Sequence, residues 1–157
     1  MKGINIAEMG HIVNVLPPVD INGGANGDVF SMENHGHATV IVQVGVSAAA
    51  FTKIIVNECT SLASAGATAI AFNAYKEETA AGDTLGSAVA VAAAGVTPSA
   101  NNSIFYVIEI DASALSDGSH FVQLSLTNAS GNSVIASAVA VLSGSRYAQD
   151  QSVTAIA

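Results

Sequence analysis

The feature that most constrains the fold is an alternation of apolar and polar residues with a period of two. Within residues 38–46, a valine occupies every second position from Val40 to Val46. Successive side chains of a β-strand point to opposite faces, so this segment is predicted to be a strand with one face in a core. The same alternation recurs over residues 104–110 and 122–127, which predicts two further strands of the same kind.

Less regular segments complete the predicted β-structure. Further strands are predicted at residues 12–15, 28–32, 51–58, 68–75, 88–91 and 133–142. Short helical turns are predicted at residues 75–81 and 111–115. Segment 133–142 is apolar on both faces, which is typical of a central strand or of one covered by a partner. Pairs such as Asn26-Gly27 and Asp117-Gly118 favour tight turns. About eight strands with regular turns predict an all-β, antiparallel β-sandwich that is jelly-roll-like.

The two ends of the chain differ from its middle. Residues 1–19 end in Pro17-Pro18, which cannot continue a central strand, so we expect an extended N-terminal arm before a sandwich domain at 20–148. Residues 149–157 are predicted to form a C-terminal tail. Both ends carry apolar residues that favour docking on another subunit over free disorder. The predicted interface residues are Ile4, Ile6, Met9, Ile12, Val13, Val153 and Ile156.

Charged residues are scarce in this chain of 157 residues. Asp, Glu, Lys and Arg make up 10% of it, against about 25% in typical soluble domains. We therefore expect neighbouring subunits to cover part of the surface. The formal net charge is −8, with only four basic residues, which argues against nucleic acid and anionic membrane as partners because both are bound through clustered cations. The chain shows neither a secretory signal nor a membrane span, so we expect a soluble protein.

Two histidines, His35 and His37, are the first candidates for a chemical site. They are two positions apart, so on a strand they would point to one side and could share a metal ion. Such a site needs further ligands, and Glu33 and His120 are only nominal options. A surface turn is therefore favoured over a metal site.

The residues from Asp20 to Asp28 mimic the alternating oxygen ligands of a calcium-binding loop. The match then fails, because Ala25 occupies the position of the loop glycine and Ser31 that of the bidentate glutamate. A turn rich in glycine and asparagine is favoured.

Carboxylate pairs suitable for acid–base catalysis are also present, at Glu77-Glu78 and at Glu109 and Asp111. The chain has no Trp and 5% aromatic residues, and it lacks a nucleophile elbow or a phosphate-binding loop. We therefore expect no enzymatic activity, no cofactor and no metal. The single cysteine, Cys59, is expected to be a small buried apolar residue.

Three stretches of sequence carry a resemblance to a known family. They are DINGGANGDVFSMENHGHATVIVQVGVSAA, AIAFNAYKEETAAGDTLG, and FYVIEIDASALSDGSHFVQL with ASAVAVLSGSRYA. Over about residues 13–148 the chain resembles the capsid decoration, or cement, proteins that tailed bacteriophages encode beside the major capsid protein. The resemblance implies a sandwich that clusters as trimers or dimers on the capsid exterior and reinforces the lattice. It implies the major capsid protein and copies of itself as partners, after synthesis in the bacterial host cytoplasm.

Two other functions stay open from the sequence. One is another virion part, such as a head fibre or a tail component, although a fibre would be expected to show repeats or sugar-stacking aromatic residues. The other is a metal-dependent binding module that uses His35, His37 and nearby carboxylates.

Overall fold

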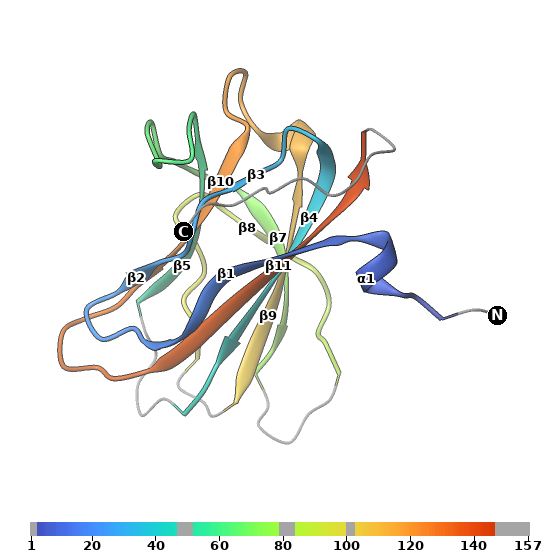
Figure 1. Ribbon diagram of the computed structural model, residues 1–157. Helices are drawn as coiled ribbons and strands as arrows, with labels where there is room; N and C mark the ends of the chain where they lie inside the picture. Colours follow the sequence, from blue (N-terminus) through green and yellow to red (C-terminus); the bar gives the residue numbers. More distant parts are fainter. Residues whose placement is uncertain (1–2, 47–51, 79–83, 100–102, 147–157) are drawn as a thin grey trace.

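Two antiparallel β-sheets pack face to face in the computed structural model, which describes residues 3–46, 52–78, 84–99 and 103–146 (Figure 1). Sheet A has the strand order β1 (His11–Asp20), β11 (Ile135–Ser145), β4 (His35–Val44), β9 (Ile104–Asp111), β7 (Phe72–Glu77) and β8 (Val89–Val91). Sheet B has the order β2 (Ala25–Asn26), β10 (Phe121–Thr127), β5 (Lys53–Cys59) and β6 (Thr68–Ile70), with β3 (Phe30–Ser31) also paired to β10. The helical elements are α1 (Ile6–Met9) and the 3-10 turn η1 (Ala112–Ala114). Within the described part of the chain, no helix has the length and hydropathy of a membrane span.

The strand pairs are nested from the two ends of the domain towards its middle. Strand β1 pairs with β11, β2 and β3 pair with β10, β4 pairs with β9, and β5 pairs with β6. Contacts of β11 with β4 and of β10 with β5 join these pairs into two sheets. This nesting is the double Greek key of a jelly roll and confirms the predicted antiparallel sandwich. The hairpin of β7 and β8 widens sheet A beyond β9. The described residues form eleven strands instead of about eight, since the short β2 was not predicted and the segment 68–75 divides into β6 and β7.

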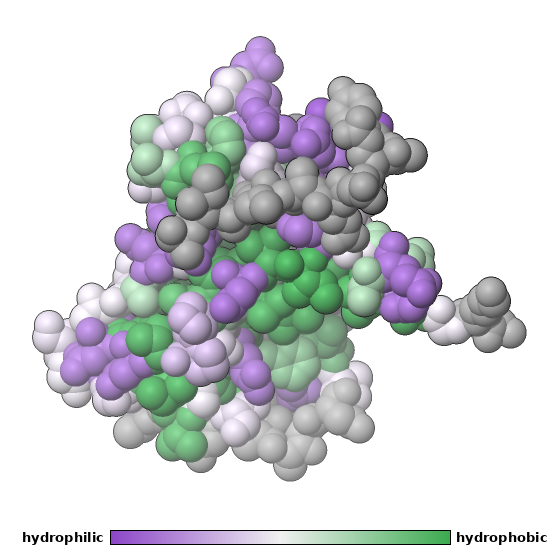
Figure 2. All heavy atoms as spheres, viewed as in Figure 1, coloured by the Kyte–Doolittle hydropathy of each residue, from purple (hydrophilic) through white to green (hydrophobic). Residues whose placement is uncertain are grey.

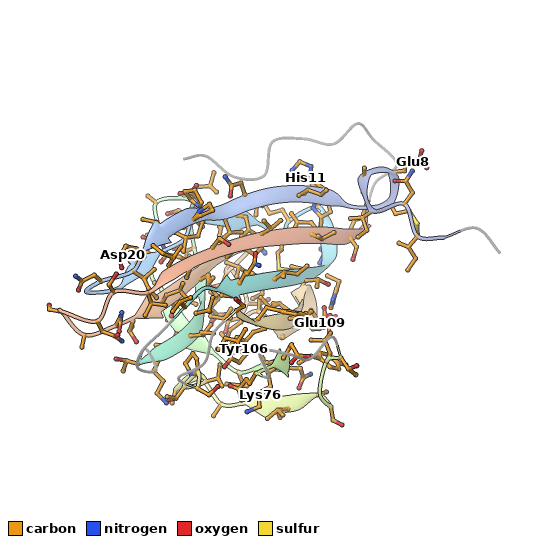
Figure 3. The ribbon with its side chains drawn as sticks, turned by 90° about the horizontal axis from the view of Figure 1, so that it is seen from below. Glu8, His11, Asp20, Lys76, Tyr106 and Glu109 are labelled. Carbon is orange, nitrogen blue, oxygen red and sulfur yellow. The ribbon has the colours of Figure 1, made fainter. Side chains whose placement is uncertain are left out.

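The core lies between the sheets and follows the alternation of the sequence. Val40, Val42 and Val44 of β4 are buried, as are Tyr106 and Ile108 of β9. The predicted inward faces of β4, β9 and β10 are therefore confirmed, except that Val46 lies beyond the end of β4 and is 71% exposed. Strand β11 is a central strand of sheet A, as predicted. Figure 3 shows side chains filling the space between the two layers, with Tyr106 inside the sandwich.

The segment at residues 68–75 was expected to be one strand, but it forms parts of two. Strand β6 ends at Ile70 and pairs with β5 in sheet B, whereas β7 begins at Phe72 and pairs with β9 in sheet A. Ala71 is therefore where the chain crosses between the sheets. The prediction of a helical turn at residues 75–81 is wrong for its first residues because β7 continues to Glu77, and residues 79–81 lie outside the described part. The turn predicted at 111–115 is confirmed by η1.

The N-terminal arm is shorter than the predicted residues 1–19. Strand β1 begins at His11, so the described arm consists of residues 3–10 and projects beyond the sandwich (Figure 1). Pro17-Pro18 is accommodated inside β1, where the register with β11 shifts. This is physically reasonable because β1 is an edge strand of sheet A, and an edge strand tolerates residues that donate no hydrogen bond.

Candidate interaction surface

The arm carries apolar side chains that its own domain does not bury. Helix α1 is a single turn in which the amides of Glu8 and Met9 donate to the Asn5 carbonyl at 3.2 and 3.1 Å. None of its residues is buried, Met9 is 70% exposed, and the preceding Ile4 is 82% exposed. Isolated helices shorter than about 12 residues are marginal in water. The exposed side chains of α1 are therefore expected to contact something beyond the domain.

Gly10 fixes where the arm leaves the sandwich. A Cβ atom at this position would lie 2.8 Å from Val141 Cγ1 and 3.2 Å from the Leu142 carbonyl oxygen of β11. The Gly10 amide also donates to the Ile6 carbonyl at 2.8 Å and so closes α1. A larger residue would push the arm off β11, so glycine sets its direction.

The outer face of sheet A, which points away from the core, is also apolar. Its central row runs across neighbouring strands through Asn14, Val139, Ile41, Val107 and Tyr75. Ile41 is 39% and Val139 37% exposed. Figure 2 shows hydrophobic side chains gathered in the middle of the molecule, over β1 and β11.

We call this surface outer face A. Its apolar members are Ile12, Ile41, Tyr75, Phe105, Val107, Ile135, Val139 and Val141. Ile12 is 52% exposed and opposes Val141, so the apolar surface reaches the edge strand from which the arm leaves. The sequence contains two signals for this face, of which the prediction used the first and not the second. Residues 133–142 are apolar on both sides, and Ile41 interrupts the polar side of β4.

The structure divides the predicted interface residues into three groups. Ile4, Ile6, Met9 and Ile12 are exposed. Val13 is 6% exposed and packs in the domain's own core, so its side chain is not available to another chain. The predicted residues Val153 and Ile156 lie outside the described part of the chain.

His37 lies on outer face A between two carboxylates and does not form a metal pair with His35. Its Nδ1 is 2.8 Å from Asp111 Oδ1, and its Nε2 is 2.6 Å from Glu109 Oε2. Partial burial lowers the pKa of His37, but the hydrogen bonds and charges of Asp111 and Glu109 outweigh that effect and raise it. Thr39 Oγ1 donates to Glu109 Oε2 at 2.7 Å. Because the carboxylates bind opposite ring nitrogens, the cluster joins β4 to β9 and does not converge on one ion.

His35 is buried, so the prediction that residues 35–37 form a surface turn is wrong: they are the start of β4. Its ring stacks on His11 with the centroids 6.0 Å apart. Burial lowers the pKa of His35, and the nearby His11 lowers it further. Among the described residues, no three His, Cys, Asp or Glu side chains are placed to hold a metal ion.

In the calcium-like segment, residues 20–28, side-chain oxygens form hydrogen bonds with other groups of the same chain. Asp20 accepts hydrogen bonds from Ser133 Oγ at 2.7 Å and from the Asn22 and Val134 amides at 3.0 and 3.1 Å. These bonds, led by that from Ser133, lower the pKa of Asp20. Asn22 Oδ1 accepts from the Gly131 amide at 2.7 Å. The side-chain oxygens therefore close turns at one end of the sandwich, in agreement with the favoured turn.

The adjacent carboxylates Glu77 and Glu78 are likewise used by the fold. Glu77 is buried and accepts from the Thr84 amide at 3.0 Å. Glu78 accepts a hydrogen bond from the buried Tyr106 hydroxyl and lies 3.0 Å from Lys76 Nζ. Burial alone would raise the pKa of Glu78, but the bonds from Tyr106 and Lys76 bring it below its usual value. Glu77 therefore holds Thr84 at the end of β7, and Glu78 joins that end to β9.

Cys59, at the end of β5, is buried, which confirms its predicted apolar role. Burial raises the pKa of its thiol, and the charge of Glu58 raises it further. The reactive thiolate is therefore disfavoured.

No family model matches the chain, and no curated protein sequence matches it. Among solved structures, the chain is similar to the crystal structure of SPBc2 prophage-derived protein YomS. The two share 14% sequence identity at a TM-score of 0.44, over 84% of this chain and 92% of that one. This distant likeness assigns neither a family nor a function to the chain.

Proposed function

We propose that this chain is a non-enzymatic structural protein of a virion, which binds the outer surface of a tailed-phage capsid and stabilises the lattice of the major capsid protein. The observation that carries the proposal is the apolar surface outside the core. Ile4 and Met9 of the arm and Ile12 and Ile41 of sheet A are all large and exposed. Monomeric soluble proteins rarely expose contiguous apolar patches that serve no interaction.

The low charge of the chain supports a permanent place in an assembly. Only 10% of its residues are charged, and the net charge is −8. A surface with few charges is costly for a freely diffusing protein but suits one whose neighbours cover it. The resemblance of residues 13–148 to capsid decoration proteins gives the assembly its proposed identity.

The polar clusters support a structural role over a catalytic one. His37 is bonded to Glu109 and Asp111, and Glu78 is bonded to Tyr106. Each of these groups joins two parts of the sandwich. A catalytic acid or base would need a face open to substrate as well as a suitable pKa.

The test is to mix the purified chain with capsids assembled without it from the major capsid protein of the same phage. The chain should sediment with the capsids, appear on their outer surface by electron cryomicroscopy and raise the temperature at which they break open. Absence of binding to those capsids would overturn the proposal. Binding to tails or fibres in place of heads would assign the chain to another virion part.

Two variants make the capsid test specific. Deletion of residues 2–9 removes the apolar arm and should reduce the gain in capsid thermal stability. Gln123→Ala changes a half-buried polar residue on the opposite sheet. It should leave capsid binding and the gain in capsid thermal stability unchanged. A loss of binding in the Gln123 variant would place the attachment surface on sheet B.

A further inference from the structure

The arm and outer face A are two apolar surfaces of one chain that do not cover each other. The arm precedes the first residue of β1, His11, at the edge of sheet A, and it extends away from the sandwich (Figures 1 and 3). Ile4 and Met9 therefore remain exposed, and so do Ile41 and Val139 on the sheet. The arm of another copy can reach the face that a chain's own arm leaves open.

The exposed area of the two surfaces approaches what a stable interface needs. Ile4, Ile6 and Met9 of the arm and Ile12, Ile41 and Val139 of the sheet are between 37% and 82% exposed. At about 100 Å² for a fully exposed large aliphatic side chain, they offer roughly 300–400 Å² per copy. A standard interface buries about 800 Å² per partner, of which roughly 450–500 Å² is apolar. The half-buried members of outer face A add to the apolar area that each copy offers.

The charges also permit this contact. The central row of outer face A, from Asn14 to Tyr75, contains no charged residue, and Glu8 is the only charged residue in the arm segment 3–10. The charged groups next to the row already have hydrogen-bond partners: Glu109 is bonded to His37 and Thr39, and Glu77 accepts from the Thr84 amide. Covering the row therefore buries no charge that lacks a hydrogen-bond partner, which is the usual large cost of burying a surface. The net charge of −8 lies mainly outside this contact.

We propose that the arm of one copy packs on outer face A of a second copy, and that two copies exchange arms in this way. Each chain supplies one arm and one face, so a symmetric pair satisfies both at once. The pairing describes the free protein. Because it covers the arm and outer face A, capsid binding through these surfaces has to replace it. A chain that pairs but ignores capsids would refute the proposed function alone.

The first test is analytical ultracentrifugation of the whole chain over a wide concentration range. The wild type should form dimers, whereas Met9→Asp and Ile41→Asp should each raise the dissociation constant by about 100-fold, as expected for a buried anchor. Val89→Asp is the matched control, because Val89 is 45% exposed on β8 and outside both surfaces. A wild type that stays monomeric, or an equal loss in the control, would overturn the proposal.

The second test holds even where an aspartate variant folds poorly. Met9→Cys is prepared in one sample and Ile41→Cys in another, and the two are mixed under mild oxidation. The native Cys59 is buried, so it should not compete. A disulfide should join the unlike variants far more than it joins Met9→Cys to a Val89→Cys control. Equal disulfide yields with Ile41→Cys and with Val89→Cys would show that the arm does not pack on outer face A.

Discussion

The outer faces of the two sheets differ in how much apolar surface they expose, although both sheets are built from the same kind of alternating strand. On sheet B, Gln123 opposes Asn57, and Ser125 opposes Asn26. The Ser125 hydroxyl donates to Asn26 Oδ1 at 2.7 Å, so this face carries its own polar contacts. Outer face A instead carries one apolar row that runs from Val139 through Ile41 and Val107 to Tyr75, with mixed rows on either side.

The difference shows which side of the sandwich is expected to meet a partner. An antiparallel sheet with one face in water normally alternates apolar inside and polar outside. Sheet B follows that rule more closely, because its outward apolar residues Ile55 and Phe121 are half-buried, whereas outer face A exposes Ile41 and Val139. Among the described residues, most of the exposed large apolar side chains lie on the arm and outer face A, although Val46, Leu85 and Val89 lie elsewhere.

The prediction with the largest expected effect tests whether the side chains of outer face A lie outside the packed core. Ile108→Ala removes a fully buried side chain from the inner face of β9 and should lower the free energy of unfolding by about 2–5 kcal/mol. Ile41→Ala, on the outer face of the adjacent β4, should cost less than about 1 kcal/mol because that side chain is 39% exposed. Urea unfolding of both variants at a concentration where the protein is monomeric measures the contrast. Equal losses would mean that Ile41 is packed like a core residue and that the two outer faces do not differ as described.

The inner faces of the sheets could be predicted from the sequence because they depend on a local rule. The period of two assigns Val40 to Val44 and Ile104 to Ile110 to the core without knowledge of their neighbours. The same rule placed Ile41 outside, but it could not say whether other apolar residues lie beside it. The cross-strand row from Val139 to Tyr75 depends on pairing between segments far apart in the chain.

The polar site was unpredictable for the same reason. His37 and Glu109 are 72 positions apart in the sequence, yet their side chains meet because β4 and β9 are paired. The arm was predicted from Pro17-Pro18, and its boundary was wrong because an edge strand admits these prolines. Composition identifies the apolar residues, whereas only the register of the strands gathers them into a surface.

A smaller effect is a pH dependence of the free energy of unfolding, which should arise from the His37 cluster on outer face A. The pKa of His37 is raised above its ordinary value of 6.5 because its hydrogen bonds to the Asp111 and Glu109 carboxylates outweigh the effect of burial. The folded state therefore binds the His37 proton more tightly than the unfolded state does. The protonated ring contributes its full stabilisation below about pH 6.5, and this contribution is lost as the pH rises through the pKa of the folded state. The difference in unfolding free energy between wild type and His37→Gln should be larger near about pH 6 than near about pH 9.

An NMR titration of the His37 ring checks the origin of that difference directly. The exposed His120 offers a matched control, because His120→Gln removes a histidine outside the cluster. The control should leave the pH dependence of unfolding unchanged. An equal change in both variants would show that the carboxylate cluster does not cause the effect.

The smallest expected effect concerns the polar outer face of sheet B. Thr127 Oγ1 is buried and has no hydrogen-bond partner in the described structure, whereas the Ser125 hydroxyl on the same side of β10 is bonded to Asn26. Thr127→Val keeps the side-chain shape and removes an unsatisfied hydroxyl, so it should raise the free energy of unfolding by up to about 1 kcal/mol. Ser125→Val loses its bond to Asn26 and should gain nothing. If urea unfolding showed that Thr127→Val destabilises the fold while Ser125→Val does not, the hydroxyl of Thr127 would have a partner of its own, and the polar face of sheet B would extend to the end of β10.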